Sequence, residues 1–268
     1  MADRKFIKGL CFDITKAFDL VNHAVLFEKL ERYGIRGRAL QWLKSYLENR
    51  EQFVELDTCG SGKVFSNLET VNVGVPQGSV LGPLLFIIYI NDILDLVKLG
   101  EKVMFVDDLS ILISCNSKEE LENTKEQMLL ELRQWLTVNN LVEQGKKRQE
   151  IIFRTSNRMY ADSLNEDDDV KSVSLLGIEL DQNLRWKDHI LKVSKKLNKA
   201  LFGISRIAKI CNRETAFSAY HALFHSVMTY DIALWGGSSE MQKLLIIQKK
   251  AIRYIMHTPK RKSCRKHF

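Results

Sequence analysis

Residues 103–114 read VMFVDDLSILIS, so two short apolar runs flank a pair of carboxylates. Runs of this length, rich in β-branched and aromatic side chains, are typical of β-strands. We therefore expect a tight hairpin that carries Asp107 and Asp108 at its tip. An isolated acidic doublet is most often only an exposed turn, because aspartate favours turns. A functional role for the doublet is favoured only if other segments with carboxylates end beside it.

A second carboxylate closes another expected strand. Residues 6–13 read FIKGLCFD, a short apolar run that ends on Asp13. Mg²⁺ takes a few carboxylate oxygens together with water and substrate phosphates. Two such ions about 4 Å apart can clamp the attacking and leaving oxygens of a phosphoryl transfer. Carboxylates at the ends of neighbouring strands would supply that cluster, and an exposed turn is the alternative.

The rest of the pattern predicts a mixed α+β protein that becomes helical towards its end. Apolar spacing, cap residues and glycine-rich turns define the elements. The predicted strands are 52–56, 64–73, 150–154 and 172–179. The predicted helices are 21–33, 39–47, 80–96, 117–138, 187–211, 213–230 and 239–257. Composition and charge shift together near 180–186, so we divide the chain into domains 1–182 and 183–268.

Charge separates the same two parts. The chain has 268 residues and a net charge of +7, with 45% hydrophobic and 27% charged residues, which is ordinary for a folded protein. Residues 183–268 hold 18 basic and 4 acidic side chains, a net charge of +14, which leaves −7 on the first 182 residues. A basic end of this kind predicts an anionic polymer or surface as its partner.

Several classes of protein are excluded by simple patterns. The longest apolar run, residues 80–90, is far shorter than the roughly 20 residues that a membrane helix needs. The first residues do not resemble a signal peptide. The five cysteines are scattered without a C-x-x-C pair, which favours reduced thiols over a disulfide framework or a zinc finger. We expect an intracellular protein with no membrane partner.

Three ordered segments resemble the successive polymerase motifs of reverse transcriptases, in the branch of non-LTR (LINE-type, jockey-like) retrotransposons. They read FDITKAFD at 12–19, GVPQGSVLGPLLF at 74–86 and FVDD at 105–108. The resemblance continues through Trp135-Leu136 with Asn139-Asn140, Leu176-Gly177-Ile178 with Asp181, Trp186 to Ile190, Tyr230, and Leu234-Trp235-Gly236. It therefore covers nearly the whole chain, and the match at 74–86 is highly specific.

The resemblance implies a fold and a reaction. The fold would be a right-hand polymerase palm, an antiparallel sheet with helices, followed by a mostly helical thumb and connection. The reaction would be RNA-directed DNA synthesis, in which the 3′-OH of a DNA primer attacks the α-phosphate of a dNTP on an RNA template. Asp13 and Asp107 would hold two Mg²⁺ ions, with Mn²⁺ as an alternative, and Asp108 would support the second ion or the primer end.

The resemblance also assigns nucleotide-binding residues. Phe18 matches the steric gate, a ring under the sugar that excludes a 2′-OH. Gln77 and Gly78 match a loop that contacts the incoming nucleotide and the template. Lys147 aligns with a lysine proposed to approach the leaving pyrophosphate. The alternatives are that Phe18 is a core residue and that Lys147 is a solvated charge.

Some positions depart from the family pattern. Val106 stands where the family usually has Ala, and Asp231 stands where it has Gly. Residues 141–148, LVEQGKKR, replace a more apolar consensus around Lys147. Drift in an unselected copy and local adaptation both remain open as explanations.

The largest departure is at the front, where only 12 residues precede Asp13. In the family, a fingers subdomain comes before this motif and supplies basic side chains to the triphosphate and the template. We therefore expect a chain truncated before the palm, without fingers. Two alternatives to an active polymerase follow: a catalytically inactive remnant that still binds nucleic acid, and an inert genomic remnant.

The basic end contains a candidate nucleic-acid-binding helix. Apolar residues in 190–211 keep a three-to-four spacing, and lysines occupy other faces. The lysines that we expect to follow a phosphate backbone are Lys192, Lys195, Lys196 and Lys199. Binding of this kind weakens steeply with salt. A solvated helix face is the alternative.

Two further features have weaker interpretations. His221 and His225 are four residues apart, as in a zinc protease helix, but Ala222 stands where the catalytic Glu would be, so packing or surface roles are favoured. Residues 260–266, KRKSCRK, could be a nuclear signal, a nucleic-acid tail or a frayed end. The family resemblance implies a nuclear location.

Overall fold

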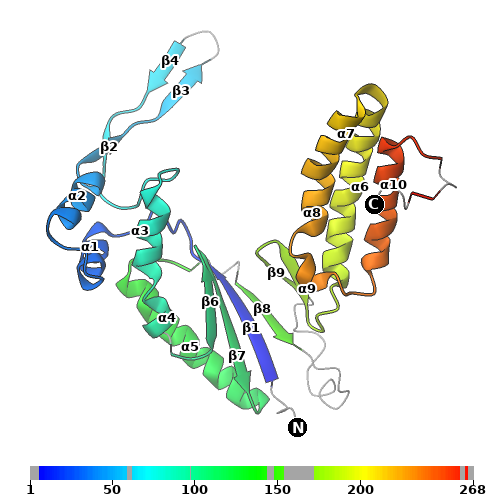
Figure 1. The fold of residues 1–268 in the computed structure, drawn as a ribbon. Helices are drawn as coiled ribbons and strands as arrows, with labels where there is room; N and C mark the ends of the chain where they lie inside the picture. The colour runs from blue at the N-terminus through cyan, green and yellow to red at the C-terminus, as the bar shows by residue number, and fades with distance from the viewer. Residues whose placement is uncertain are drawn as a thin grey trace. The chain divides into compact units, whose positions relative to one another are not determined.

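A computed structural model describes most of the chain and divides it into two compact units, Met1–Ile152 and Phe153–Phe268 (Figure 1). Each unit has its own cluster of buried apolar side chains. The described residues are 6–58, 62–96, 98–143, 148–153, 172–259 and 263–264. Within these ranges no helix is both long enough and apolar enough to cross a membrane.

The first unit is built on a four-stranded sheet with the strand order β6-β7-β1-β8 (Figure 1). The strands are β1 (Phe6–Asp13), β6 (Glu101–Phe105), β7 (Asp108–Cys115) and β8 (Gln149–Phe153). β7 runs antiparallel to both β1 and β6. Alternate residues of β7, from Leu109 to Cys115, are buried, as expected for a strand with one face on a core. Lys8 of β1 is buried and forms ion pairs with Glu122 and Glu150.

Helices of the first unit complete its core. They are α1 (His23–Arg32), α2 (Gly37–Leu47), α3 (Leu81–Ile90), α4 (Ile93–Leu96) and α5 (Lys118–Val138). The side chains of Asn22 and Ser117 cap the starts of α1 and α5 by accepting backbone N–H groups. α5 packs on β7 and β1. The helix predicted at 80–96 is two helices, separated at Asn91 and Asp92.

The hairpin predicted between 52 and 73 is present as two successive two-stranded ladders. β2 (Arg50–Gln52) pairs with β5 (Glu69–Val71), and β3 (Glu55–Thr58) pairs with β4 (Gly62–Phe65). The ladders are separated where the Val54 N–H donates to the Ser66 hydroxyl. All residues of β3 and β4 are exposed. Figure 1 shows this hairpin extending away from the helices of its unit.

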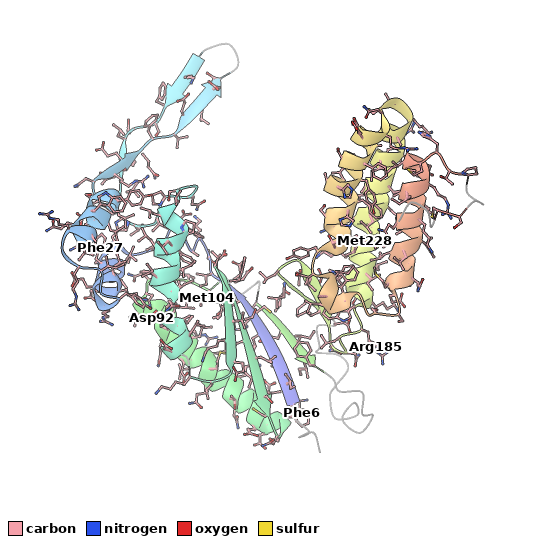
Figure 2. All side chains as sticks on the ribbon, viewed as in Figure 1. Phe6, Phe27, Asp92, Met104, Arg185 and Met228 are labelled. Carbon is pink, nitrogen blue, oxygen red and sulfur yellow. The ribbon has the colours of Figure 1, made fainter. Side chains whose placement is uncertain are left out.

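The second unit is a helical bundle that carries a short hairpin. The hairpin joins β9 (Ser172–Leu175) to β10 (Ile178–Asp181). The helices are α6 (Lys187–Ile210), α7 (Arg213–Tyr220), the π-helical turn η3 (His221–His225), α8 (Ser226–Thr229), α9 (Ile232–Trp235) and α10 (Met241–Ile255). α6 packs against α10 and α7. Met228 lies within this bundle (Figure 2) and is 4% exposed.

The division between the units differs from the predicted boundary at 182/183. The hairpin β9–β10 belongs with the helices, because it is bonded to α6. The Glu179 N–H donates to Nδ1 of His189, the Glu179 carboxylate pairs with Lys192, and Ile178 is buried. The sequence becomes more basic and more helical after this hairpin, whereas the contacts between residues divide the chain before it. The polar loop predicted between the strands lies outside the described residues.

Candidate active site

The carboxylates Asp13 and Asp108 are direct partners across the β1–β7 ladder. Phe105 pairs with Asp108, so Val106 and Asp107 form a two-residue turn between β6 and β7. The predicted hairpin is present, but its turn lies one residue earlier than predicted, because Asp108 is the first residue of β7. Val106 has φ +55°, a left-handed conformation that is costly for a β-branched side chain. Strained residues of this kind cost on the order of 1–3 kcal/mol and are often found at functional sites.

The negative charges of two neighbouring carboxylates act on Asp108. Partial burial, and then the negative charges of Asp107 and Asp13, raise the pKa of Asp108 above its ordinary value. Like charges held close together disfavour ionisation, and a bound cation would relieve that cost. The tip of the hairpin is therefore an anionic site suited to a cation.

A pocket of about 690 Å³ opens beside this tip. It is lined by the segment that follows β1, by the loop before α3 and by Asp107. The lining residues are Asp13, Ile14, Thr15, Lys16, Ala17, Phe18, Gln77, Gly78, Pro83 and Asp107. Five predicted site residues thus share one pocket, namely Asp13, Phe18, Gln77, Gly78 and Asp107. Asp108 lies next to this group without lining the pocket.

Glycine at position 74 lets the two motif segments meet. Gly74 has φ +89°, and a Cβ there would lie 2.9 Å from the carbonyl oxygen of Asp19. The Gly74 N–H donates to the Val21 carbonyl and the Val75 N–H donates to the Phe18 carbonyl, both at 2.8 Å. A side chain would prevent this approach, which accounts for the glycine that opens the motif.

The predicted nucleotide-binding residues are held in place around the pocket. Phe18 is half-buried and stacks on Phe86, with ring centroids 4.6 Å apart, so it is both a core contact and a pocket wall. The Gln77 amide donates to Asp19 at 2.8 Å. Gly78 has φ +80°, and a Cβ there would meet open space. Asp19 is the positioning residue that the sequence analysis missed, although it ends the first motif.

The backbone after Asp13 is supported by the loop that follows α5. The Thr15 N–H donates to the Val142 carbonyl at 2.9 Å, and Ile14 forms an isolated bridge with Glu143. The start of the same loop is held by the Tyr89 hydroxyl, which donates to the Asn139 carbonyl at 2.6 Å. Sequence reasoning assigned no role to Tyr89, and its only signal was its place on the apolar helix.

The carboxylates around the pocket are few for a divalent metal site made of protein groups alone. Among the described residues, no three His, Cys, Asp or Glu side chains gather closely enough to surround an ion by themselves. Two carboxylates do line the pocket, and a third is adjacent to them. Mg²⁺ is commonly held by one or two carboxylates plus substrate phosphates, so these residues fit Mg²⁺ that is partly held by a substrate.

Other predicted residues lie elsewhere. Lys147 is outside the described residues. On α6, Lys192 forms an ion pair with Glu179, whereas Lys195, Lys196 and Lys199 are exposed. His221 and His225 lie on η3 with ring centroids 5.4 Å apart.

Comparison with known proteins agrees with the motifs. The family model described as "Reverse transcriptase (RNA-dependent DNA polymerase)" matches residues 3–180. The chain is 26% identical to "RNA-directed DNA polymerase from mobile element jockey" of Drosophila funebris, covering 96% of this chain and 29% of that protein. It is 25% identical to "Probable RNA-directed DNA polymerase from transposon X-element" of Drosophila melanogaster, covering 94% and 28%.

A solved structure of telomerase from Candida albicans with a TWJ fragment of telomeric RNA has a TM-score of 0.48 and 13% identity, and the match covers 96% of this chain and 49% of that one. The chain spans less than a third of the length of the curated relatives named above. The family model covers well over half of the chain, and the chain therefore belongs to the reverse transcriptase (RNA-dependent DNA polymerase) family, in its non-LTR retrotransposon branch.

Proposed function

We propose that this chain carries the polymerase centre of an RNA-directed DNA polymerase, which transfers a nucleotide from a dNTP to a primer 3′-OH on an RNA template. One observation carries the proposal: a single pocket is lined by Asp13, Asp107, Phe18, Gln77 and Gly78, which come from three separate motifs. In this proposal the first unit acts as the palm and the second as the thumb and connection.

The carboxylates of the first unit would hold the metal. Asp13 and Asp107 line the pocket, and Asp108 faces Asp13 across the ladder. When bound, Mg²⁺ would stabilise the developing charge on the attacking and leaving oxygens, and Mn²⁺ is the alternative ion. The paired strands fix the backbone of Asp13 and Asp108, so little reorganisation of these residues is needed during the reaction.

The walls of the pocket would select and orient the nucleotide. Stacking on Phe86 fixes the Phe18 ring, which gives it the rigidity that a steric gate against a 2′-OH requires. The bond to Asp19 restrains Gln77, and the absent side chain of Gly78 lets a substrate approach the backbone. Lys147 keeps its proposed role near the leaving pyrophosphate on the family resemblance alone.

The second unit would bind the template and primer. Lys195, Lys196 and Lys199 are exposed on α6, where cations can follow a phosphate backbone. Lys192 contributes less in this proposal, because it already pairs with Glu179.

Primer extension on an RNA template tests the proposal. The Asp107→Asn variant should lose roughly 10³-fold or more in incorporation, because a pocket carboxylate that acts on the transition state is removed. Asp57→Asn is the matched control, since Asp57 is exposed on the hairpin β3–β4 away from the pocket. Its activity should be unchanged. Incorporation that survives in Asp107→Asn, or an intact chain that binds template–primer without extending it, would contradict the proposal.

A further inference from the structure

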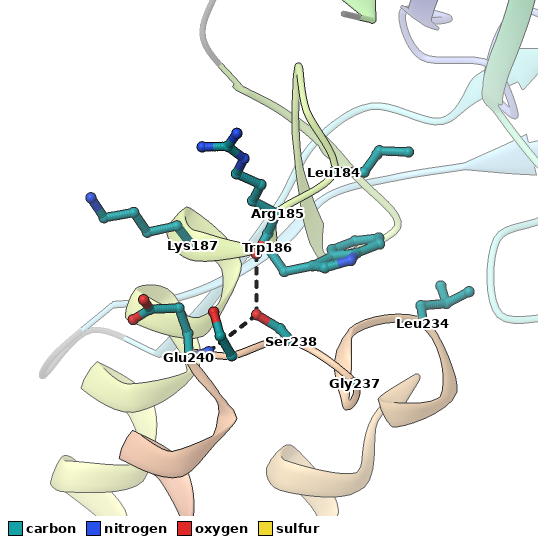
Figure 3. Close-up of a pocket in the computed structure, with 9 residues that line it drawn as sticks. Leu184, Arg185, Trp186, Lys187, Leu234, Gly237, Ser238 and Glu240 are labelled. Carbon is teal, nitrogen blue, oxygen red and sulfur yellow. Dashed lines mark hydrogen bonds between the residues drawn. The ribbon is translucent and has the colours of Figure 1, made fainter. Parts of the chain in front are cut away.

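A second pocket, of about 700 Å³, lies wholly within the second unit (Figure 3). It forms where the turn before α6 meets the segment that joins α9 to α10. Both segments contain family-like sequence, and the proposed reaction uses neither of them. The lining residues are Leu184, Arg185, Trp186, Lys187, Leu234, Gly237, Ser238, Ser239 and Glu240.

Hydrogen bonds fix the shape of this pocket. The Asp181 carboxylate accepts backbone N–H groups from Asn183, Arg185 and Trp186, at 3.1, 3.0 and 2.6 Å. The Ser238 hydroxyl donates to the Arg185 carbonyl at 3.2 Å and accepts the Glu240 N–H at 3.3 Å (Figure 3). Two lining segments more than 50 residues apart in sequence are thereby connected.

The backbone around the pocket is strained. Leu184 and Trp186 have φ of +51° and +65°, and neither is a glycine or an asparagine. Such conformations are costly and persist only where the surrounding structure enforces them. The bonds to Asp181 restrain the backbone of this turn.

The pocket has an aromatic side and a cationic side. Figure 3 shows the Trp186 indole projecting between Leu184 and Leu234, while Arg185 and Lys187 extend in the other direction. The indole is half-buried and the two leucines are about half exposed. Across the described part of the chain, neither Arg185 nor Lys187 has a carboxylate within 4.0 Å. Glu240, the one acidic lining residue, is paired with Lys243, and the charge of Lys187 acts on it more weakly.

We infer that this pocket binds one unpaired nucleotide of a nucleic-acid strand, with its base stacked on Trp186 and the neighbouring phosphates held by Arg185 and Lys187. The inference rests on the proposed function only in taking nucleic acid as the ligand. An indole on one side of the pocket and two cations without a close ion pair on the other match the two parts of a nucleotide, its π face and its phosphate. A base inside a duplex is already stacked on its neighbours, so the site selects single-stranded segments.

Binding of a labelled ten-nucleotide single strand to the full chain, measured at several salt concentrations, tests this inference. Trp186→Leu should weaken binding by about 5- to 100-fold with little change in the salt slope, because a stacking contact is lost. Trp186→Phe should keep most of the affinity. The double variant Arg185→Ala with Lys187→Ala should instead reduce the magnitude of the salt slope by about 1.4, as expected for two phosphate contacts.

Trp42→Leu is the matched control, since the Trp42 indole is 58% exposed on α2 and lies outside the pocket. Any one of three results would overturn the inference. The first is an equal loss of affinity in Trp42→Leu and Trp186→Leu, and the second is an equal loss of affinity in Trp186→Leu and Trp186→Phe. The third is an equal loss of affinity for a blunt duplex and for a single strand. Extension activity separates the two proposals. Loss of strand affinity in Trp186→Leu supports the pocket even if the chain never extends a primer. Extension with normal affinity in that variant refutes the pocket alone.

Discussion

The two pockets have nearly equal volumes, about 690 and 700 Å³, but opposite charge. The pocket of the first unit is lined by Asp13 and Asp107, with Asp108 beside them, and by one cation, Lys16, so its charged lining is mainly acidic. The pocket of the second unit is lined by Arg185 and Lys187 and by one carboxylate, Glu240, so its charged lining is mainly basic. The comparison teaches that the sign of the charge, rather than the size of the pocket, separates a candidate reaction site from a candidate binding site.

The pockets also differ in how their walls are brought together. In the first, backbone groups meet directly, and this depends on the absence of a side chain at Gly74. In the second, one carboxylate, that of Asp181, gathers three N–H groups of a strained turn. Each construction therefore has a position where one substitution should damage one pocket and leave the other intact.

The largest structural effect is expected at Gly74. Gly74→Ala should lower the free energy of unfolding by about 2–4 kcal/mol, because the new Cβ meets the Asp19 backbone at 2.9 Å and φ is +89°. Gly78→Ala is the matched control, with φ +80° but open space around a Cβ, and should cost about 1–2 kcal/mol. Urea unfolding measures both. Equal losses at the two positions would show that the close approach does not matter.

The second prediction concerns the pocket of the second unit. Asp181→Ala should destabilise the second unit by about 2 kcal/mol, since three N–H groups lose a charged acceptor. Hydrogen exchange should become faster in α6 and stay unchanged in β1 and β7. Asp188→Ala is the control, because Asp188 is exposed in the first turn of α6 and should cost well under 1 kcal/mol. Faster exchange in both units would mean that Asp181 does not act locally.

The prediction with the smallest expected effect tests the negative charge at the pocket of the first unit. The pKa of Asp108 is raised in the folded state, so folding favours its protonated form and stability falls as pH rises from the ordinary aspartate pKa through the raised value. Asp108→Asn removes this cost. The variant should therefore be slightly more stable than the wild type at pH 7, by less than about 1 kcal/mol because the group is exposed to solvent.

Thermal unfolding across pH measures this difference, which should shrink as pH falls to about 4, near the ordinary aspartate pKa. Millimolar Mg²⁺ at pH 7 should also reduce it, because a cation relieves the repulsion that acts on the Asp108 carboxylate, which the variant lacks. A variant that is less stable than the wild type at pH 7 would contradict the electrostatic account.

Much of the first unit could be predicted from the sequence. The hairpin around Asp107, the strand that ends on Asp13 and the long helix α5 all follow from local spacing and turn residues, and all three are present. The strand predicted at 150–154 is present as β8, but only the structure shows that it joins the main sheet, whereas β9 pairs with β10. The spacing of apolar residues predicts that a segment is a strand, but it does not indicate which other strand it pairs with.

The sequence by itself determined the identity of the candidate site, because the motifs around Asp13, Gln77 and Asp107 keep recognisable side chains in a recognisable order. Only the tertiary structure decided how that site is held together, through the bond from Gln77 to Asp19 and the stacking of Phe18 on Phe86. It also decided that Trp186 and Leu234 share a pocket. Local pattern reflects the energetics of neighbouring residues, whereas contacts between distant segments depend on the packing of the whole unit.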